Sequence, residues 1–147
     1  MIDEITAAER EWLETQLANA RQLVLSVAGT SDLAVENLQA AWDAWLSLGE
    51  TDTTNINTVI NALGIAFGQS LADGGQLQWV IATDQQGSDL ALHGFPGTAD
   101  VLIYPANLIA KRWEIRERGF MVPLFRQIRK QINDVAISAS AADPPES

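Results

Sequence analysis

Two arginines in the predicted helix 105–117 are the side chains of this sequence with the clearest potential for chemistry. Pro105 opens this helix, because proline suits the first turn, and Gly119 follows the end of the helical pattern. At about 100° per residue, Arg112 and Arg116 fall inside the apolar arc of this helix, which is formed by Leu108, Ile109, Trp113 and Ile115. A guanidinium among apolar neighbours must pair with a carboxylate, stack on an aromatic ring or line a cleft.

The sequence leaves two interpretations of these arginines open. In the more common case each forms a structural ion pair with an acidic residue such as Asp84 or Asp89, and packs its stem on Trp113. In the other case both arginines, together with Lys111, bind an anion or an acidic partner. The contacts of the Arg112 guanidinium decide between the two.

The sequence lacks the residue constellations of familiar catalytic and metal sites. It has no cysteine and one histidine, His93, which excludes thiolate chemistry and any site that needs two imidazoles. No HExxH, DxDxDG or GxSxG motif is present. Aspartates flank the predicted strands at Asp84, Asp89 and Asp100, where turns alone favour this residue. We therefore expect no catalytic residue, no metal and no cofactor, and we favour a binding role over an enzyme.

Helical and strand patterns alternate along the chain in a way that predicts an α+β domain. A chain of 147 residues suffices for one domain with a substantial core. Thr6 and Glu9 form a capping-box pattern that opens a long amphipathic helix. The expected elements are helices from the Thr6 cap to Gly29, from a cap at Ser31 or Asp32, and over 56–71; strands over 77–83, 89–93 and 101–104; and helices over 105–117 and 121–136.

These patterns place N-terminal helices before a small three-stranded antiparallel meander and two C-terminal helices after it. We expect a single domain over residues 1–137 and a frayed tail over 138–147, because the tail is small, polar and contains proline. Gly64 and Gly68 lie on one face of the third helix. Since glycine costs about 1 kcal/mol of helix propensity relative to alanine, we expect a strand or a helix to pack closely there.

The charge distribution limits the kinds of molecule that we expect this protein to bind. Nine basic and nineteen acidic residues give a net charge of −10. Residues 1–100 carry two bases against fourteen acids, whereas all seven bases of residues 101–147 lie between Lys111 and Lys130. The average field repels nucleic acid and anionic lipid, so we expect neither as a partner. No apolar run reaches about 18 residues and the first residues are acidic, which leads us to expect a cytoplasmic protein.

The segment from Leu63 to Arg112 resembles a bacterial family called domain of unknown function 3806. The resemblance rests on Leu63-Gly64, Phe67-Gly68, Trp79, Asp84 with Gly87 and Asp89, and Pro105 followed by Lys111-Arg112. It implies a small α+β bacterial domain in which a short sheet follows a glycine-containing helix. It brings no activity, cofactor or catalytic residue. The candidate binding residues are Lys111, Arg112, Arg116, Trp79, Asp84 and Asp89.

The function expected from these observations is recognition of another protein, in an immunity-like or adaptor-like role. An acidic protein of this size can mask a basic partner, and its aromatic and basic segments can contribute contacts. The alternative is a small-ligand-binding domain or an enzyme, in which Arg112 orients an anion in a cleft between the sheet and the helices. The sequence also leaves a homodimer open.

Overall fold

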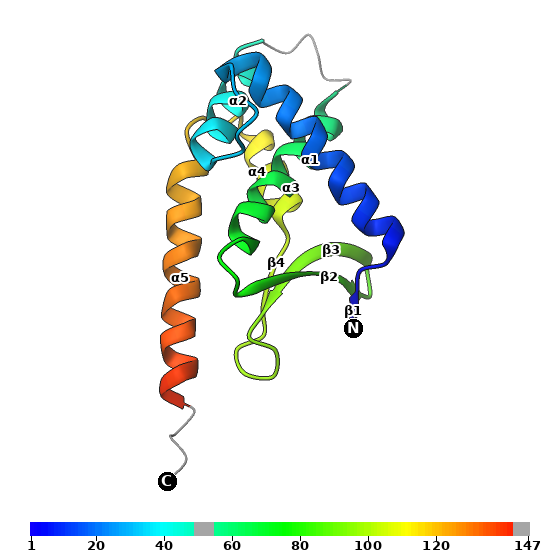
Figure 1. Ribbon diagram of the computed structural model, residues 1–147, viewed down its shortest axis with the longest axis vertical. Coiled ribbons are helices and arrows are strands. Elements are labelled where there is room, and N and C mark those ends of the chain that lie inside the picture. The colour runs from blue at the N-terminus through cyan, green and yellow to red at the C-terminus, as the bar shows by residue number, and fades with distance from the viewer. Residues whose placement is uncertain (49–54, 143–147) are drawn as a thin grey trace.

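The computed structural model describes residues 1–48 and 55–142, with side chains through residue 138. Within these ranges the chain forms five helices and a four-stranded antiparallel sheet (Figure 1). The predicted α+β class is therefore confirmed. The elements in chain order are β1 (Ile2–Glu4), α1 (Ala7–Ala28), α2 (Val35–Ser47), α3 (Ile56–Ala72), β2 (Leu77–Asp84), β3 (Gly87–Gly94), β4 (Val101–Ile103), α4 (Pro105–Glu114) and α5 (Met121–Ala142).

The sheet has one strand more than the sequence predicted. Its order is β1-β2-β3-β4, and each neighbouring pair is antiparallel. The prediction of three strands is wrong because β1 has only three residues, all exposed, and shows no alternation of apolar and polar side chains. β1 is held by its pairing with β2 and by two hydrogen bonds between Met1 and Thr83, of 2.7 and 2.8 Å. These contacts join distant parts of the chain, so local propensity does not reveal them.

Helices lie on one face of the sheet, and α5 runs along its side (Figure 1). Trp79 of β2 and Leu92 of β3 are paired across the strands and belong to the main core, together with the fully buried Trp42 and Phe67 of the helices. Alternate strand residues point to the opposite face. There they form a second, smaller cluster of Val80, Ala82, Ala91 and the partly buried Tyr104.

The first helix begins as predicted, and the second does not. The N–H of Thr6 donates to Oε1 of Glu9 over 2.6 Å, and the N–H of Glu9 donates to Oγ1 of Thr6 over 3.3 Å, which completes the capping box. The predicted cap of the next helix at Ser31 or Asp32 is wrong, because α2 begins after Ala34. Asp32 instead accepts the N–H of Ala34 in the turn that precedes the helix.

The two glycines of α3 allow both a helix and a strand to approach. A Cβ atom added at Gly64 would lie 2.8 Å from Cα of Ala106, and one at Gly68 would lie 2.7 Å from Cγ of Pro105 and from Cη2 of Trp79. Carbon atoms that are not bonded normally stay about 3.5–4.0 Å apart. The expected close packing is therefore confirmed, and it fixes the position of α4 on α3.

The two C-terminal helices differ in length from the prediction. α4 ends at Glu114 rather than near Glu117, because Arg116 takes a left-handed backbone conformation with φ of 52°. α5 continues to Ala142 rather than ending near residue 136, so residues 138–142 of the expected tail are helical. Residues 143–147 lie outside the described ranges. Among the helices that are described, none is long and apolar enough to cross a membrane.

Candidate functional site

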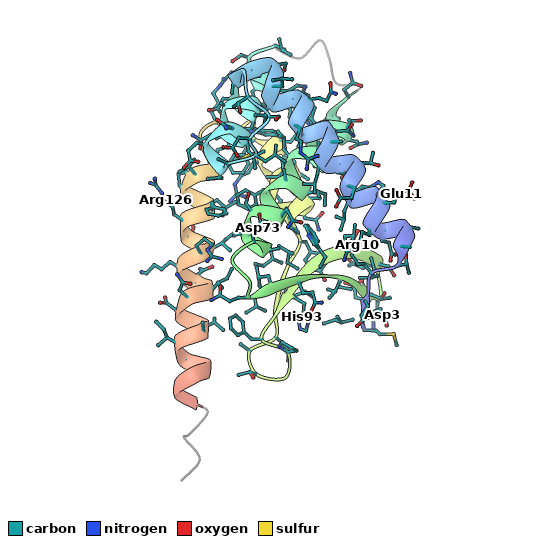
Figure 2. The ribbon with its side chains drawn as sticks, viewed as in Figure 1. Asp3, Arg10, Glu11, Asp73, His93 and Arg126 are labelled. Atoms are coloured by element: carbon teal, nitrogen blue, oxygen red, sulfur yellow. The ribbon has the colours of Figure 1, made fainter. Side chains whose placement is uncertain are left out.

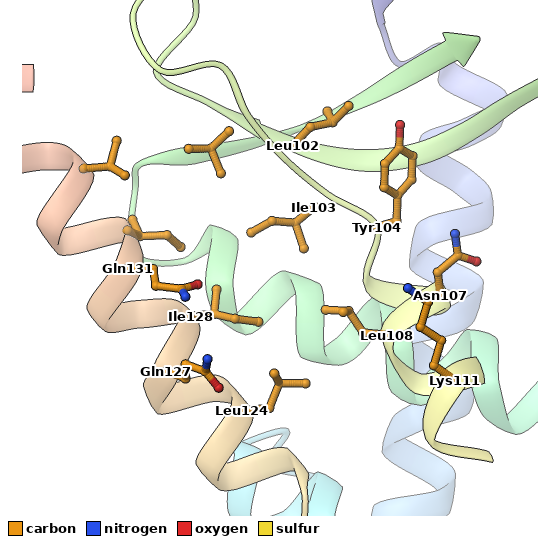
Figure 3. Close-up of a pocket in the computed structure, with 13 residues that line it drawn as sticks. Leu102, Ile103, Tyr104, Asn107, Leu108, Lys111, Leu124, Gln127, Ile128 and Gln131 are labelled. Atoms are coloured by element: carbon orange, nitrogen blue, oxygen red, sulfur yellow. The ribbon is translucent and has the colours of Figure 1, made fainter. Parts of the chain in front are cut away.

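An apolar groove lies between the edge of the sheet and the last two helices (Figure 3). β4 and α5 form facing walls, α4 contributes one end, and the enclosed volume is about 570 Å³. The lining residues are Val101, Leu102, Ile103 and Tyr104 from β4 and its end, Asn107, Leu108 and Lys111 from α4, and Leu124, Gln127, Ile128, Gln131, Ile132 and Val135 from α5.

The α5 wall is an apolar stripe with helical spacing. Leu124, Ile128, Ile132 and Val135 follow one another at three or four residues and so share a face. Ile128 and Ile132 are buried, whereas Leu124 and Val135 stay partly exposed. α5 packs mainly on α2 and also contacts α3. These two helices therefore cover one side of the stripe, and the other side is open toward β4.

β4 presents its outer edge to the groove. All four residues from Val101 to Tyr104 line it, although successive side chains of a strand point to opposite faces of the sheet. A groove that all four residues line must therefore run along the edge of the strand. β4 is the last strand in the sheet order, so no strand of the described ranges pairs with this edge. Such an edge offers main-chain N–H and C=O groups to another chain.

Two pairs of polar side chains flank the apolar floor of the groove. Asn107 and Lys111 lie one turn apart on α4, and Gln127 and Gln131 lie one turn apart on α5. Figure 3 shows the two pairs on opposite sides of the apolar side chains. All four residues are exposed. The three amides can each donate and accept hydrogen bonds, whereas the ammonium of Lys111 can only donate.

Of the six candidate binding residues, Lys111 alone lines this groove. It is also the one charged residue among the lining residues. No carboxylate of the described ranges lies within ion-pair distance of its ammonium, since the ion pairs there are His93–Asp100 and Arg112–Glu117. The fold therefore leaves this cation available to a ligand.

Arg112 is paired within the fold. Its Nε lies 3.4 Å from Oε2 of Glu117, and its guanidinium carbon lies 5.6 Å from the centre of the Phe120 ring. The ion pair is half-exposed, at 28% for the arginine and 39% for the glutamate. The prediction that Asp84 or Asp89 pairs with Arg112 is wrong. The turn after α4 brings Glu117 back to the helix, where the N–H of Glu117 donates to the carbonyl oxygen of Arg112 over 3.1 Å.

Arg116 lies beyond the end of α4, so its predicted place on the apolar face of that helix is wrong. Its guanidinium carbon is 3.7 Å from the centre of the Trp113 ring, and Nη1 donates to the carbonyl oxygen of Trp113 over 3.2 Å. Trp113 in turn contacts Trp45 and Trp42, with ring centroids 4.7 and 6.4 Å apart. Arg116 therefore covers an aromatic cluster through a cation–π contact.

The other three candidates do not join a common site. Trp79 is buried, and its Nε1 donates to Oε1 of Gln69 over 3.0 Å. Asp84 is exposed at the turn between β2 and β3, where it accepts the N–H of Gln86. Asp89 is exposed on β3. In the part of the chain that the structure describes, no group of three or more His, Asp or Glu residues could hold a metal ion.

A pair of polar residues, His93 (labelled in Figure 2) and Asp100, lies at the two ends of the loop that leads into β4. Nε2 of His93 lies 3.1 Å from Oδ1 of Asp100, and the same oxygen accepts the N–H of Gly97 over 3.1 Å. The hydrogen bond from Gly97, followed by that from His93, lowers the pKa of Asp100 below its ordinary value of 3.8. Because His93 pairs with Leu102 across the two strands, this loop helps to position the β4 edge.

Sequence reasoning did not find the edge of β4 or the two glutamines on α5. Isolated glutamines on an amphipathic helix have the pattern of an ordinary solvated face. The signal that was available is the apolar stripe of α5, which continues through Val135 and requires an apolar surface opposite it. Only the position of β4 shows that part of this surface is a groove.

Comparison with known proteins shows to which family the chain belongs. No curated protein and no solved structure matches the chain. Residues 34–125 match the family model described as "Domain of unknown function (DUF3806)". The match extends beyond the segment that carries the sequence resemblance and covers more than half of the 147 residues. It includes β4, α4 and the first residues of α5. The chain therefore belongs to the DUF3806 family.

Proposed function

We propose that this protein is a non-catalytic binding domain that takes up an extended segment of another protein in the groove between β4 and α5. The observation that carries the proposal is the unpaired edge of β4, whose residues Val101–Ile103 line the apolar groove together with Tyr104. An extended segment can add to such an edge through main-chain hydrogen bonds while its alternate side chains enter apolar pockets.

The dimensions and chemistry of the groove suit a peptide. β4 has three residues, so its edge matches an extended segment of about three residues. The partly exposed Leu124 and Val135 supply apolar surface for its side chains. The exposed amides of Asn107, Gln127 and Gln131 can hydrogen-bond to its main chain, whereas an alkyl chain offers them no hydrogen-bond partner in place of water. These features favour a protein segment over a small apolar anion.

The alternative in which Arg112 orients an anion has less support. Arg112 does not line the groove and is paired with Glu117. A small apolar carboxylate can still be tested against the peptide in the same experiment, with decanoate as the probe. We expect decanoate not to displace a bound peptide.

A random octapeptide library selected on the immobilised full chain tests the proposal. Val135→Glu places a carboxylate in the groove wall, and Ile137→Glu places the same group on α5 outside the groove, where the isoleucine is already exposed. We expect the enriched peptides to alternate apolar and polar residues. Their affinity should fall at least about tenfold for Val135→Glu, which corresponds to about 1.4 kcal/mol, and should not change for Ile137→Glu.

Amide hydrogen exchange identifies the mode of binding. Strand addition should slow the exchange of main-chain amides on β4 and leave β1 at the other edge of the sheet unchanged. Selected peptides that bind Val135→Glu as tightly as the wild type would refute the groove as the binding site. Displacement of those peptides by decanoate would favour the small-ligand alternative.

A further inference from the structure

We infer that Lys111 makes the groove selective for a segment that carries one acidic side chain at the end next to α4. This inference rests on the proposed function and adds a charge preference to it. The supporting features are an ammonium without an internal carboxylate partner, at one end of a groove whose other lining residues are uncharged.

Among the described residues of the C-terminal segment, Lys111, Arg126 and Lys130 have cationic groups without an ion-pair partner, and of these three Lys111 alone lines the groove. Arg112 pairs with Glu117, and the guanidinium of Arg116 stacks on Trp113. Further along the chain, two more arginines donate to oxygens of other helices, Arg118 to the carbonyl of Asp43 and to Oγ of Ser47, and Arg129 to the carbonyl of Leu71. The charged groups of these four side chains are therefore in contact with other parts of the fold.

The surroundings of Lys111 are suited to a carboxylate. Asn107 precedes Lys111 by one helical turn, and Figure 3 shows both side chains on the same side of the groove. The amide of Asn107 can donate to a carboxylate oxygen while the ammonium pairs with it, and hydrogen bonds to a charged group are shorter and stronger than neutral ones. The apolar stripe of α5 lies across the groove from this pair, so Lys111 and Asn107 supply the polar groups at this end of the groove.

The overall charge limits the segment to a single acidic residue at this point. The protein carries a net charge of −10, so its average field opposes a segment with many carboxylates. The attraction of one lysine is screened within about 8–10 Å at ordinary salt. A segment with one carboxylate among apolar and neutral polar residues gains the local attraction and avoids most of the repulsion.

Selection of the same octapeptide library on Lys111→Glu tests the inference. Lys130→Glu is the matched control, because Lys130 is exposed on α5, outside the groove lining, and the change of charge is identical. The wild type and Lys130→Glu should enrich aspartate or glutamate at one fixed position of the peptide. Lys111→Glu should enrich lysine or arginine at that position.

Affinities of one selected peptide and of its glutamine counterpart complete the test. Replacing the acidic residue by glutamine should weaken binding to the wild type about fivefold, and should not weaken binding to Lys111→Glu. Peptides that depend on the groove but carry no fixed acidic position would overturn the inference and leave the proposed function intact. The absence of any selected peptide sensitive to Val135→Glu would overturn both.

Discussion

Replacing Gly64 by alanine should destabilise the protein, although alanine is the better helix former. The substitution gains about 1 kcal/mol of helix propensity. The new methyl group would lie 2.8 Å from Cα of Ala106 and 3.3 Å from the carbonyl oxygen of Pro105. These are backbone atoms of α4, which cannot rotate away as a side chain can. Overpacking typically costs about 1–3 kcal/mol, and contact with a backbone belongs at the upper end, so we expect a net loss of about 1–2 kcal/mol.

Urea denaturation of Gly64→Ala measures this loss, and Ala18→Gly provides the calibration. Ala18 is exposed on α1, so its replacement reports the propensity difference between the two residues in this protein without a steric contribution. The melting temperature of Gly64→Ala should fall by about 3–6 °C. A Gly64→Ala variant that is more stable than the wild type, by the difference seen at position 18, would refute the close approach of α4 to α3.

Three further substitutions test individual side-chain contacts elsewhere in the fold. Arg112→Gln should lower the free energy of unfolding in urea by less than about 1 kcal/mol, because water screens the half-exposed pair with Glu117; a loss above about 2 kcal/mol would contradict this. Trp42→Phe should cost about 2–3 kcal/mol in the same assay, since the fully buried indole loses a 2.8 Å hydrogen bond to the carbonyl oxygen of Glu117; an unchanged midpoint would show that the bond contributes little. The pKa of Asp100 is lowered in the folded state, so its carboxylate stabilises the fold above the ordinary value of 3.8, and this contribution is lost as the pH falls through the lower folded value. Asp100→Asn should therefore lower the urea midpoint near neutral pH, and the difference from the wild type should shrink as the pH falls below that value; a difference independent of pH would contradict the assignment.

Local patterns were sufficient for most elements of the fold. Helical spacing and the Thr6–Glu9 capping box predicted α1, and alternation between short turns predicted β2 and β3, because these signals reside in neighbouring residues. β1 was missed because its stability comes from pairing with β2, far along the chain. The end of α4 was misplaced because the left-handed Arg116 is held by its contact with Trp113.

The sequence predicted only part of the candidate site. The apolar stripe of α5 and the basic character of Lys111 are visible in the sequence, and both contribute to the groove. Arg112 pairs with Glu117 and Arg116 stacks on Trp113, and neither arginine lines the groove. Spacing along a helix indicates which side chains share a face, but not which neighbour that face meets.

The sequence by itself determined the α+β class, the glycine face of α3 and the strongly acidic balance of the first hundred residues, because each depends on residue type and short-range spacing. Only the tertiary structure decided where charge and apolar surface remain open. The stripe of α5 packs on α2 and α3 and leaves a gap toward β4, and the two glycines of α3 fix the position of α4 and thereby of Lys111. The physical reason is that an open edge and an unpaired cation are properties of how separate elements meet, which no single segment encodes.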